Sequence, residues 1–151
     1  MFDDINDLYQ QVILDHCKKP RNFHEMPQAT CSAQGHNPLC GDEITVSANL
    51  EDGKLLEVTF EGAGCSISQS SASMMTESVG GKTVEDAMSL AADVRGMLAG
   101  EVEPDEDHFG DLVALKGVVK YPIRIKCAVL AWDVLQEAVA DSGAASGAAA
   151  H

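Results

Sequence analysis

The chain has 151 residues, of which 45% are hydrophobic, so it has the size of one domain and enough apolar side chains for a core. Its 24 acidic and 10 basic residues give a formal net charge of −14, which argues against binding to nucleic acids or anionic membranes. No apolar run is long enough to span a bilayer, and Met1-Phe2-Asp3-Asp4 lacks the basic start of a signal peptide, so we expect a cytoplasmic protein.

The five cysteines are an odd number, so they cannot all pair in disulfides within the chain. In a reducing compartment, thiols serve more often as metal ligands or nucleophiles than as crosslinks. The place of each cysteine among the predicted elements therefore bears on function.

The N-terminal part of the chain predicts one helix. Apolar side chains recur every three or four residues over 5–13, which is the pattern of one helical face. Asp3 or Asp4 can cap this helix, and Pro20 ends it. Residues 28–35 are few and polar, and they are compatible with a short edge strand.

An antiparallel hairpin is predicted next. Apolar and polar residues alternate over 44–50 and again over 56–60, and Asp52-Gly53 between them is typical of a tight turn. The residues expected on the buried face of the second strand are Leu56, Val58 and Phe60. Paired strands bring the two outer ends of a hairpin together, so Cys40 and Asp42 before the first strand should lie beside Cys65 after the second.

The remainder predicts helices interrupted by an acidic loop. The expected helices cover 66–79, run from Thr83 to Gly100 with a candidate break at Gly96, cover 111–115, and begin again at Pro122 with Cys127 in the opening turns. Residues 101–108 are acidic and should form a solvated loop. We expect a single domain over 1–141 and a disordered tail over 142–151, where small residues dominate.

Three thiols and one carboxylate stand out as candidate ligands: Cys40, Asp42, Cys65 and Cys127. Each of these cysteines lies at an element boundary beside a glycine, a proline or a basic residue. Four ligands are the number that a tetrahedral zinc site takes. Arg124 and Lys126 flank the last cysteine, where they could lower its pKa or hold an anionic persulfide.

The residues alone leave alternatives open. There is no Cys-x-x-Cys pair, and Asp42 is equally well explained as an ordinary turn residue. His36 is the best spare ligand among the histidines. Cys17 and Cys31 have no partner motif, and we interpret them as packing residues.

Three motifs together resemble the U-type iron–sulfur cluster assembly proteins, the family of IscU and the N-terminal part of NifU. They are Asn37-Pro38-Leu39-Cys40-Gly41-Asp42, Gly62-Ala63-Gly64-Cys65-Ser66-Ile67-Ser68 and Arg124-Ile125-Lys126-Cys127-Ala128-Val129-Leu130. The chain resembles the SufU-type branch, because IscU-type members carry histidine where Lys126 stands. An insertion between the second and third cysteines also fits that branch.

This resemblance implies an α+β fold, with a small antiparallel sheet covered by helices. It implies a zinc ion held by Cys40, Asp42, Cys65 and Cys127, with Cys40 as the acceptor of persulfide sulfur. The implied partners are a SufS-type cysteine desulfurase, which Arg124 would engage, and downstream Suf assembly proteins. The resemblance therefore suggests a zinc-dependent sulfurtransferase, although whether such an acceptor counts as an enzyme in its own right stays open.

Two other functions use the same residues. The thiols could hold iron, so the chain could be a scaffold that assembles an iron–sulfur cluster and hands it on. It could also be a structural zinc module that only provides an interaction surface.

Overall fold

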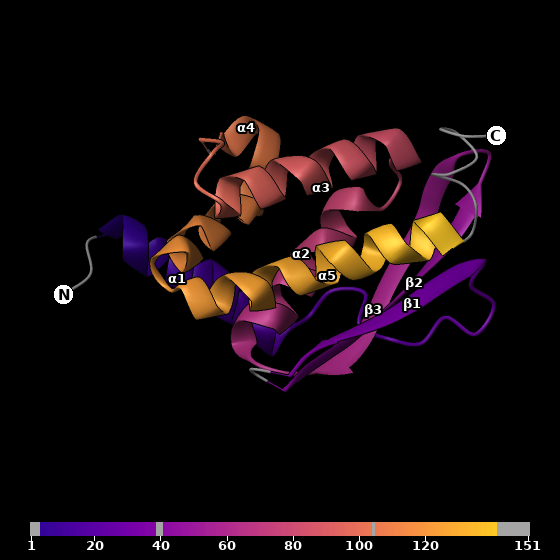
Figure 1. The fold of residues 1–151 in the computed structure, drawn as a ribbon, viewed down its shortest axis with the longest axis horizontal. Coiled ribbons are helices and arrows are strands. Elements are labelled where there is room, and N and C mark those ends of the chain that lie inside the picture. Colours follow the sequence, from indigo (N-terminus) through magenta and orange to yellow (C-terminus); the bar gives the residue numbers. More distant parts are fainter. Residues whose placement is uncertain (1–3, 39–40, 104, 142–151) are drawn as a thin grey trace.

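The computed structural model describes residues 4–38, 41–103 and 105–141 of the chain. It is an α+β fold in which helices lie against a three-stranded antiparallel sheet of order β1-β2-β3 (Figure 1). The strands are β1 (Cys31–Asn37), β2 (Asp42–Glu51) and β3 (Lys54–Ala63). The helices are α1 (Asp4–Lys18), α2 (Ser66–Val79), α3 (Val84–Leu98), α4 (Glu106–Phe109), the 3₁₀ helix η1 (Gly110–Lys120) and α5 (Pro122–Asp141). The fold class expected from the sequence is confirmed.

The hairpin of β2 and β3 forms where the alternation predicts it. Asp52 and Gly53 have φ values of 53° and 78°, the left-handed conformation that both central residues of a tight hairpin turn adopt. Glu43 pairs with Ala63 at the opposite end, so Asp42, which begins β2, and Cys65, which follows β3, are brought together there. This confirms the expectation that Asp42 and Cys65 are neighbours.

One residue of the hairpin was assigned to the wrong face. Leu56 is 52% exposed, whereas Leu55 is fully buried. The cause is a shift in the β2–β3 register between Asn49 and Leu50, because such an irregularity reverses the alternation of side chains beyond it. Val58 and Phe60 lie on the buried face as expected.

The short edge strand that the sequence allows over 28–35 is present as β1, and its last residue lies opposite Asp42. It pairs with β2 from Cys31 opposite Ala48 to Asn37 opposite Asp42. Asn37 therefore lies directly across from Asp42, the first residue of β2. Cys31 is 7% exposed and belongs to the core, which confirms its interpretation as a packing residue.

Two of the middle helices differ in detail from the expectation. Helix α3 does not break at Gly96 but continues to Leu98, and a Cβ atom at Gly96 would come within 2.6 Å of Val102. The glycine thus permits close packing of the chain that follows. The acidic segment 101–108 is not entirely a loop, because α4 begins within it. The short helix expected over 111–115 is part of the longer η1. Buried apolar side chains, among them Phe109 and Leu115, anchor both against the core.

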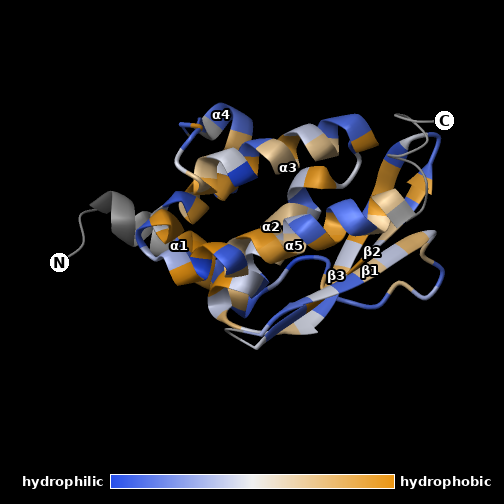
Figure 2. Cartoon of the chain, in the orientation of Figure 1, coloured by the Kyte–Doolittle hydropathy of each residue, from blue (hydrophilic) through white to orange (hydrophobic). Residues whose placement is uncertain are grey.

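The core lies between the sheet and the helices. Trp132 of α5 is fully buried, and Met74 and Met75 of α2 are at most 1% exposed, so all three side chains pack in the core. Figure 2 shows that both α2 and α5 carry apolar residues, and those that face the core include Ala72 and Val79 of α2 and Leu135 of α5. Within the described ranges, no helix is long and apolar enough to cross a membrane. The tail expected over 142–151 lies outside the described residues.

Candidate metal centre

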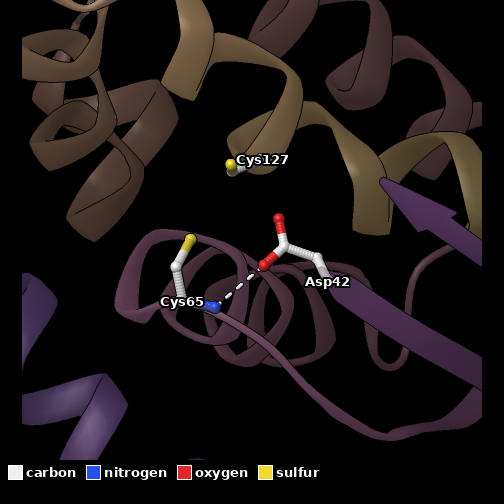
Figure 3. A group of neighbouring side chains, drawn as sticks. All are labelled: Asp42, Cys65 and Cys127. Atoms are coloured by element: carbon white, nitrogen blue, oxygen red, sulfur yellow. Dashed lines mark hydrogen bonds between the residues drawn. The ribbon is translucent and has the colours of Figure 1, made fainter. Parts of the chain in front are cut away.

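Three elements far apart in the sequence bring Asp42, Cys65 and Cys127 together. One ligand atom from each side chain lies within 4.8 Å of the others (Figure 3). Asp42 begins β2, Cys65 is the N-cap residue of α2, and Cys127 lies in the second turn of α5. A carboxylate oxygen and two thiols at this spacing are a ligand set suited to zinc.

The two oxygens of Asp42 have different surroundings. Oδ1 accepts a hydrogen bond from the backbone N–H of Cys65 at 2.8 Å and one from the Ser68 hydroxyl at 3.1 Å. Oδ2 is buried and has no hydrogen-bond partner among the described residues. In Figure 3 this second oxygen points to the side on which the two sulfur atoms lie. A buried carboxylate oxygen that lacks a partner fits a metal ligand.

The charge of Asp42 is favoured despite its burial. Burial alone would raise the pKa of this carboxyl, but the backbone N–H of Cys65 and the side chains of Cys127, Ser68 and Cys65 more than offset that effect. The pKa of Asp42 therefore lies below its ordinary value. An ionised carboxylate is the form that binds a metal.

Each thiol faces a hydrogen-bond donor. The Ser68 backbone N–H donates to the Cys65 sulfur at 3.5 Å, and this thiol also caps the N-terminus of α2, where the helix dipole favours negative charge. The Asn37 side-chain amide donates to the Cys127 sulfur, also at 3.5 Å. Both sulfurs are thus oriented by hydrogen-bond donors of the protein, as the ligands of a metal commonly are.

The two thiols differ in accessibility. Cys127 is fully buried, whereas Cys65 is partly exposed. Cys65 lines an open hollow together with Gly64 and residues 120–124. Tyr121 and Ile123 in this hollow are 60% and 66% exposed. The candidate centre thus borders a partly apolar surface.

The other candidates from the sequence have different places. Cys40 lies outside the described residues. Arg124 is exposed and lines the hollow beside Cys65, and Lys126 is also exposed, in the first turns of α5. His36 is exposed on β1 and does not belong to the group of Asp42, Cys65 and Cys127. Cys17 is partly buried in α1.

Sequence reasoning missed two residues of the centre. Ser68 belongs to a serine-rich stretch in which nothing distinguishes it except its place three residues after Cys65, where a helix N-cap side chain accepts a backbone N–H. Asn37 is part of the first cysteine motif, but a role for its amide depends on where α5 packs.

The comparison with known families agrees with this geometry. The profile described as NifU-like N terminal domain matches residues 8–128. The chain belongs to the NifU-like N-terminal domain family. The resemblance to U-type iron–sulfur cluster assembly proteins that the three cysteine motifs indicate is therefore confirmed.

Relatives in this family include a SufU protein. The chain is 42% identical over 137 residues to the protein of Bacillus subtilis (strain 168) named zinc-dependent sulfurtransferase SufU, covering 91% of this chain and 92% of that protein. It is 40% identical over 135 residues to a Streptococcus pyogenes serotype M1 protein named iron–sulfur cluster assembly scaffold protein IscU, covering 89% and 84%. The SufU-type resemblance inferred from the sequence is thus confirmed.

Solved structures of the NifU-like family share the fold. FiSufU from Fervidobacterium islandicum AW-1 matches with a TM-score of 0.81 and 34% identity, covering 89% of this chain and 98% of that one. A NifU-like N-terminal structure from Brucella abortus, 24% identical, has a TM-score of 0.82 over 91% of this chain and 96% of that one. The second likeness concerns the fold alone.

Proposed function

We propose that this chain is a zinc-dependent sulfurtransferase that accepts persulfide sulfur for iron–sulfur cluster assembly. The observation that carries the proposal is the convergence of the Asp42 carboxylate and the Cys65 and Cys127 thiols within 4.8 Å. The name of the Bacillus subtilis relative supports zinc and sulfur transfer. Zinc holds thiolates at neutral pH and does not itself exchange electrons.

We propose Cys40 as the fourth ligand and as the sulfur acceptor. Its neighbours in the chain support this role, because Asp42 is two residues away and Asn37, three residues before it, contacts the Cys127 thiol. The buried Cys127 cannot be reached by the thiol of another protein. Cys40, which lies in the sequence between β1 and β2, is therefore the better candidate for the acceptor.

The transfer step balances without an added oxidant. The Cys40 thiolate attacks the terminal sulfur of a persulfide on the partner's cysteine. The partner's sulfur–sulfur bond breaks as the new bond forms on Cys40, and the partner's cysteine leaves as a thiolate. The rate depends on the thiolate fraction of Cys40 and on access to it. Cys65 and Cys127, each with a hydrogen-bond donor at its sulfur, are the thiols that would hold a bound zinc ion.

A SufS-type cysteine desulfurase is the proposed sulfur donor, and downstream Suf assembly proteins are the proposed recipients. The hollow beside Cys65 supports a docking role for its rim, because Tyr121 and Ile123 are exposed and Lys120 and Arg124 add positive charge. Arg124 is proposed to engage an acidic group of the desulfurase. Local positive charge stands out in a chain whose net charge is −14.

Desulfurase turnover tests the proposal. Alanine release by a cognate desulfurase would be measured under mild reductant, with and without the zinc-loaded chain. We expect strong stimulation by the wild type and by Cys17→Ala, a matched control that removes a thiol outside the centre. Stimulation should vanish with Cys40→Ala. Wild-type turnover with Cys40→Ala, while that variant remains folded, would overturn the assignment of the acceptor.

A scaffold for an iron–sulfur cluster is the second candidate function. It is favoured by the Streptococcus pyogenes relative, whose name describes a scaffold, and by the fact that thiolates also bind iron. Anaerobic reconstitution followed by visible absorption separates the two functions. A stable cluster that passes to an acceptor protein would favour the scaffold, and its absence would favour sulfur transfer.

A purely structural zinc module is the third candidate function. In that case Cys40→Ala would impair folding, and mass spectrometry of the wild type after desulfurase turnover would find no added sulfur. Detection of one added sulfur on Cys40 would exclude this function.

A further inference from the structure

The Ser68 hydroxyl has a specific place beside the candidate metal centre. Ser68 is 1% exposed, and its Oγ lies 3.1 Å from Asp42 Oδ1 and 3.0 Å from the Cys65 carbonyl oxygen. One hydroxyl proton is available for these two acceptors. Charged acceptors form the stronger hydrogen bonds, so the carboxylate is the favoured one.

The space around this hydrogen bond permits little else. A Cβ atom added at Gly64 would lie 2.4 Å from Asp42 Oδ1 and 2.7 Å from Ser68 Oγ. The main chain therefore passes close to both groups, and the carboxylate cannot turn over without displacing its surroundings. The backbone N–H of Cys65 donates to the same oxygen and adds a second restraint on its orientation.

The two oxygens of the Asp42 carboxylate therefore differ in their hydrogen bonds. Two donors occupy Oδ1, whereas Oδ2 is buried without a partner among the described residues. Carboxylates bind metals through one oxygen or through both. An oxygen that already accepts two hydrogen bonds from the protein is a poor second ligand atom.

We infer that Ser68 is a positioning residue that restricts Asp42 to one metal-binding oxygen and so keeps the centre four-coordinate. This inference rests on the proposed zinc function. It assigns to the Ser68 hydroxyl a part in selecting which metal the centre binds. Four-coordination suits zinc, whereas metals that prefer six ligands gain from a second carboxylate oxygen. Ser68 would therefore favour zinc at a centre whose thiols also bind other metals.

Metal binding by Ser68→Ala tests the inference. Ser70→Ala is the matched control, because Ser70 is also buried in α2 but donates its hydroxyl to the carbonyl oxygen of Ile13. Zinc affinity would be measured by competition with a chromophoric chelator. Loss of an outer hydrogen bond to a ligand weakens metal binding by roughly 10–100-fold, so we expect a change in this range for Ser68→Ala and none for Ser70→Ala.

Cobalt substitution reports the coordination number directly. Tetrahedral Co²⁺ absorbs visible light more strongly than five- or six-coordinate Co²⁺, so the wild type and Ser70→Ala should show intense bands. Ser68→Ala should show weaker bands, and its preference for zinc over Fe²⁺ should fall. An unchanged cobalt spectrum together with unchanged zinc affinity in Ser68→Ala would overturn the inference.

Two further measurements separate positioning from folding. Thermal unfolding of each metal-free variant gives the cost of the lost hydroxyl, and the rise in Tm on adding zinc gives the effect on metal binding. Ser68→Thr retains the hydroxyl and should recover tetrahedral cobalt bands, whereas a merely structural role would leave them intact in Ser68→Ala as well. A wild-type protein that binds no zinc would overturn both the proposed function and this inference. Intact sulfur transfer with a failed Ser68 test would overturn this inference alone.

Discussion

Asn37 donates its side-chain amide to the Cys127 sulfur at 3.5 Å, although 90 residues separate the two in the chain. Asn37 ends β1 opposite Asp42, and Cys127 lies in α5. The contact therefore connects the sheet edge that carries the first cysteine motif with the helix that carries the third. An amide donor beside a buried thiol stabilises its charged form.

Replacing the amide donor of Asn37 with a carboxylate should weaken metal binding. In Asn37→Asp the buried amide donor is replaced by a carboxylate near the sulfur, which disfavours the Cys127 thiolate by repulsion. We expect zinc affinity to fall at least ~10-fold by chelator competition. Asn49→Asp is the control, since it adds the same charge to β2 near the other end of the strand. Equal affinities of the two variants would contradict the role assigned to Asn37.

Gly64→Ala should strain the centre by steric overlap. The new Cβ would lie 2.4 Å from Asp42 Oδ1 and 3.0 Å from the Asp42 Cα. Overpacking of this kind costs about 1–3 kcal/mol in the free energy of unfolding. Gly117→Ala is the matched control, because no atom lies within 4 Å of the Cβ it would add. Urea unfolding of both variants checks the difference, and equal stabilities would show that the Gly64 segment moves aside at little cost.

The sequence predicted that Asp42 and Cys65 lie side by side, and the physical reason is clear. The turn at Asp52-Gly53 sets the pairing of β2 and β3, and pairing necessarily brings Asp42 to Cys65. The position of Cys127 could not be obtained in this way. It depends on how α5 packs across β1, and the apolar side of a helix indicates that it packs but not against what.

The errors have equally local causes. Leu56 was placed on the wrong face because a register irregularity at Asn49/Leu50 leaves no mark in the alternation of apolar residues. The hydroxyl of Ser68 and the amide of Asn37 were overlooked because their partners come from other elements. Polar residues that orient ligands have no periodicity of their own, so only the packed structure identifies them.

The stability of the metal-free protein should depend on Asp42 at low pH. The pKa of Asp42 in the folded chain lies below the ordinary value of 3.8, because the hydrogen-bond donors around it outweigh the opposing effect of burial. A lowered pKa stabilises the folded state above pH 3.8, and this contribution is lost as the pH falls through the lower folded value. Unfolding free energies of wild type and Asp42→Asn, measured from pH 7 down to about pH 2, should converge at the acid end, because the contribution disappears only below both pKa values. A constant difference across this range would contradict the prediction.

The rim of the hollow should matter for partner binding more than for metal binding. Ile123 is 66% exposed beside Lys120 and Arg124, so it costs the isolated chain little to replace it. If a desulfurase docks there, Ile123→Asp removes an apolar contact and places negative charge among basic groups. Loss of a hot-spot residue of an interface costs about 2 kcal/mol or more in binding, and about 1.4 kcal/mol is already a factor of ten.

The concentration of the chain that gives half-maximal desulfurase stimulation should therefore rise about tenfold or more for Ile123→Asp, whereas its zinc affinity should stay the same. Leu56→Asp is the matched control, because Leu56 is 52% exposed but lies at the end of the hairpin away from the centre. The same stimulation curve for both variants would mean that the desulfurase contacts another face. A loss of zinc in Ile123→Asp would mean that the residue supports the centre and not the partner.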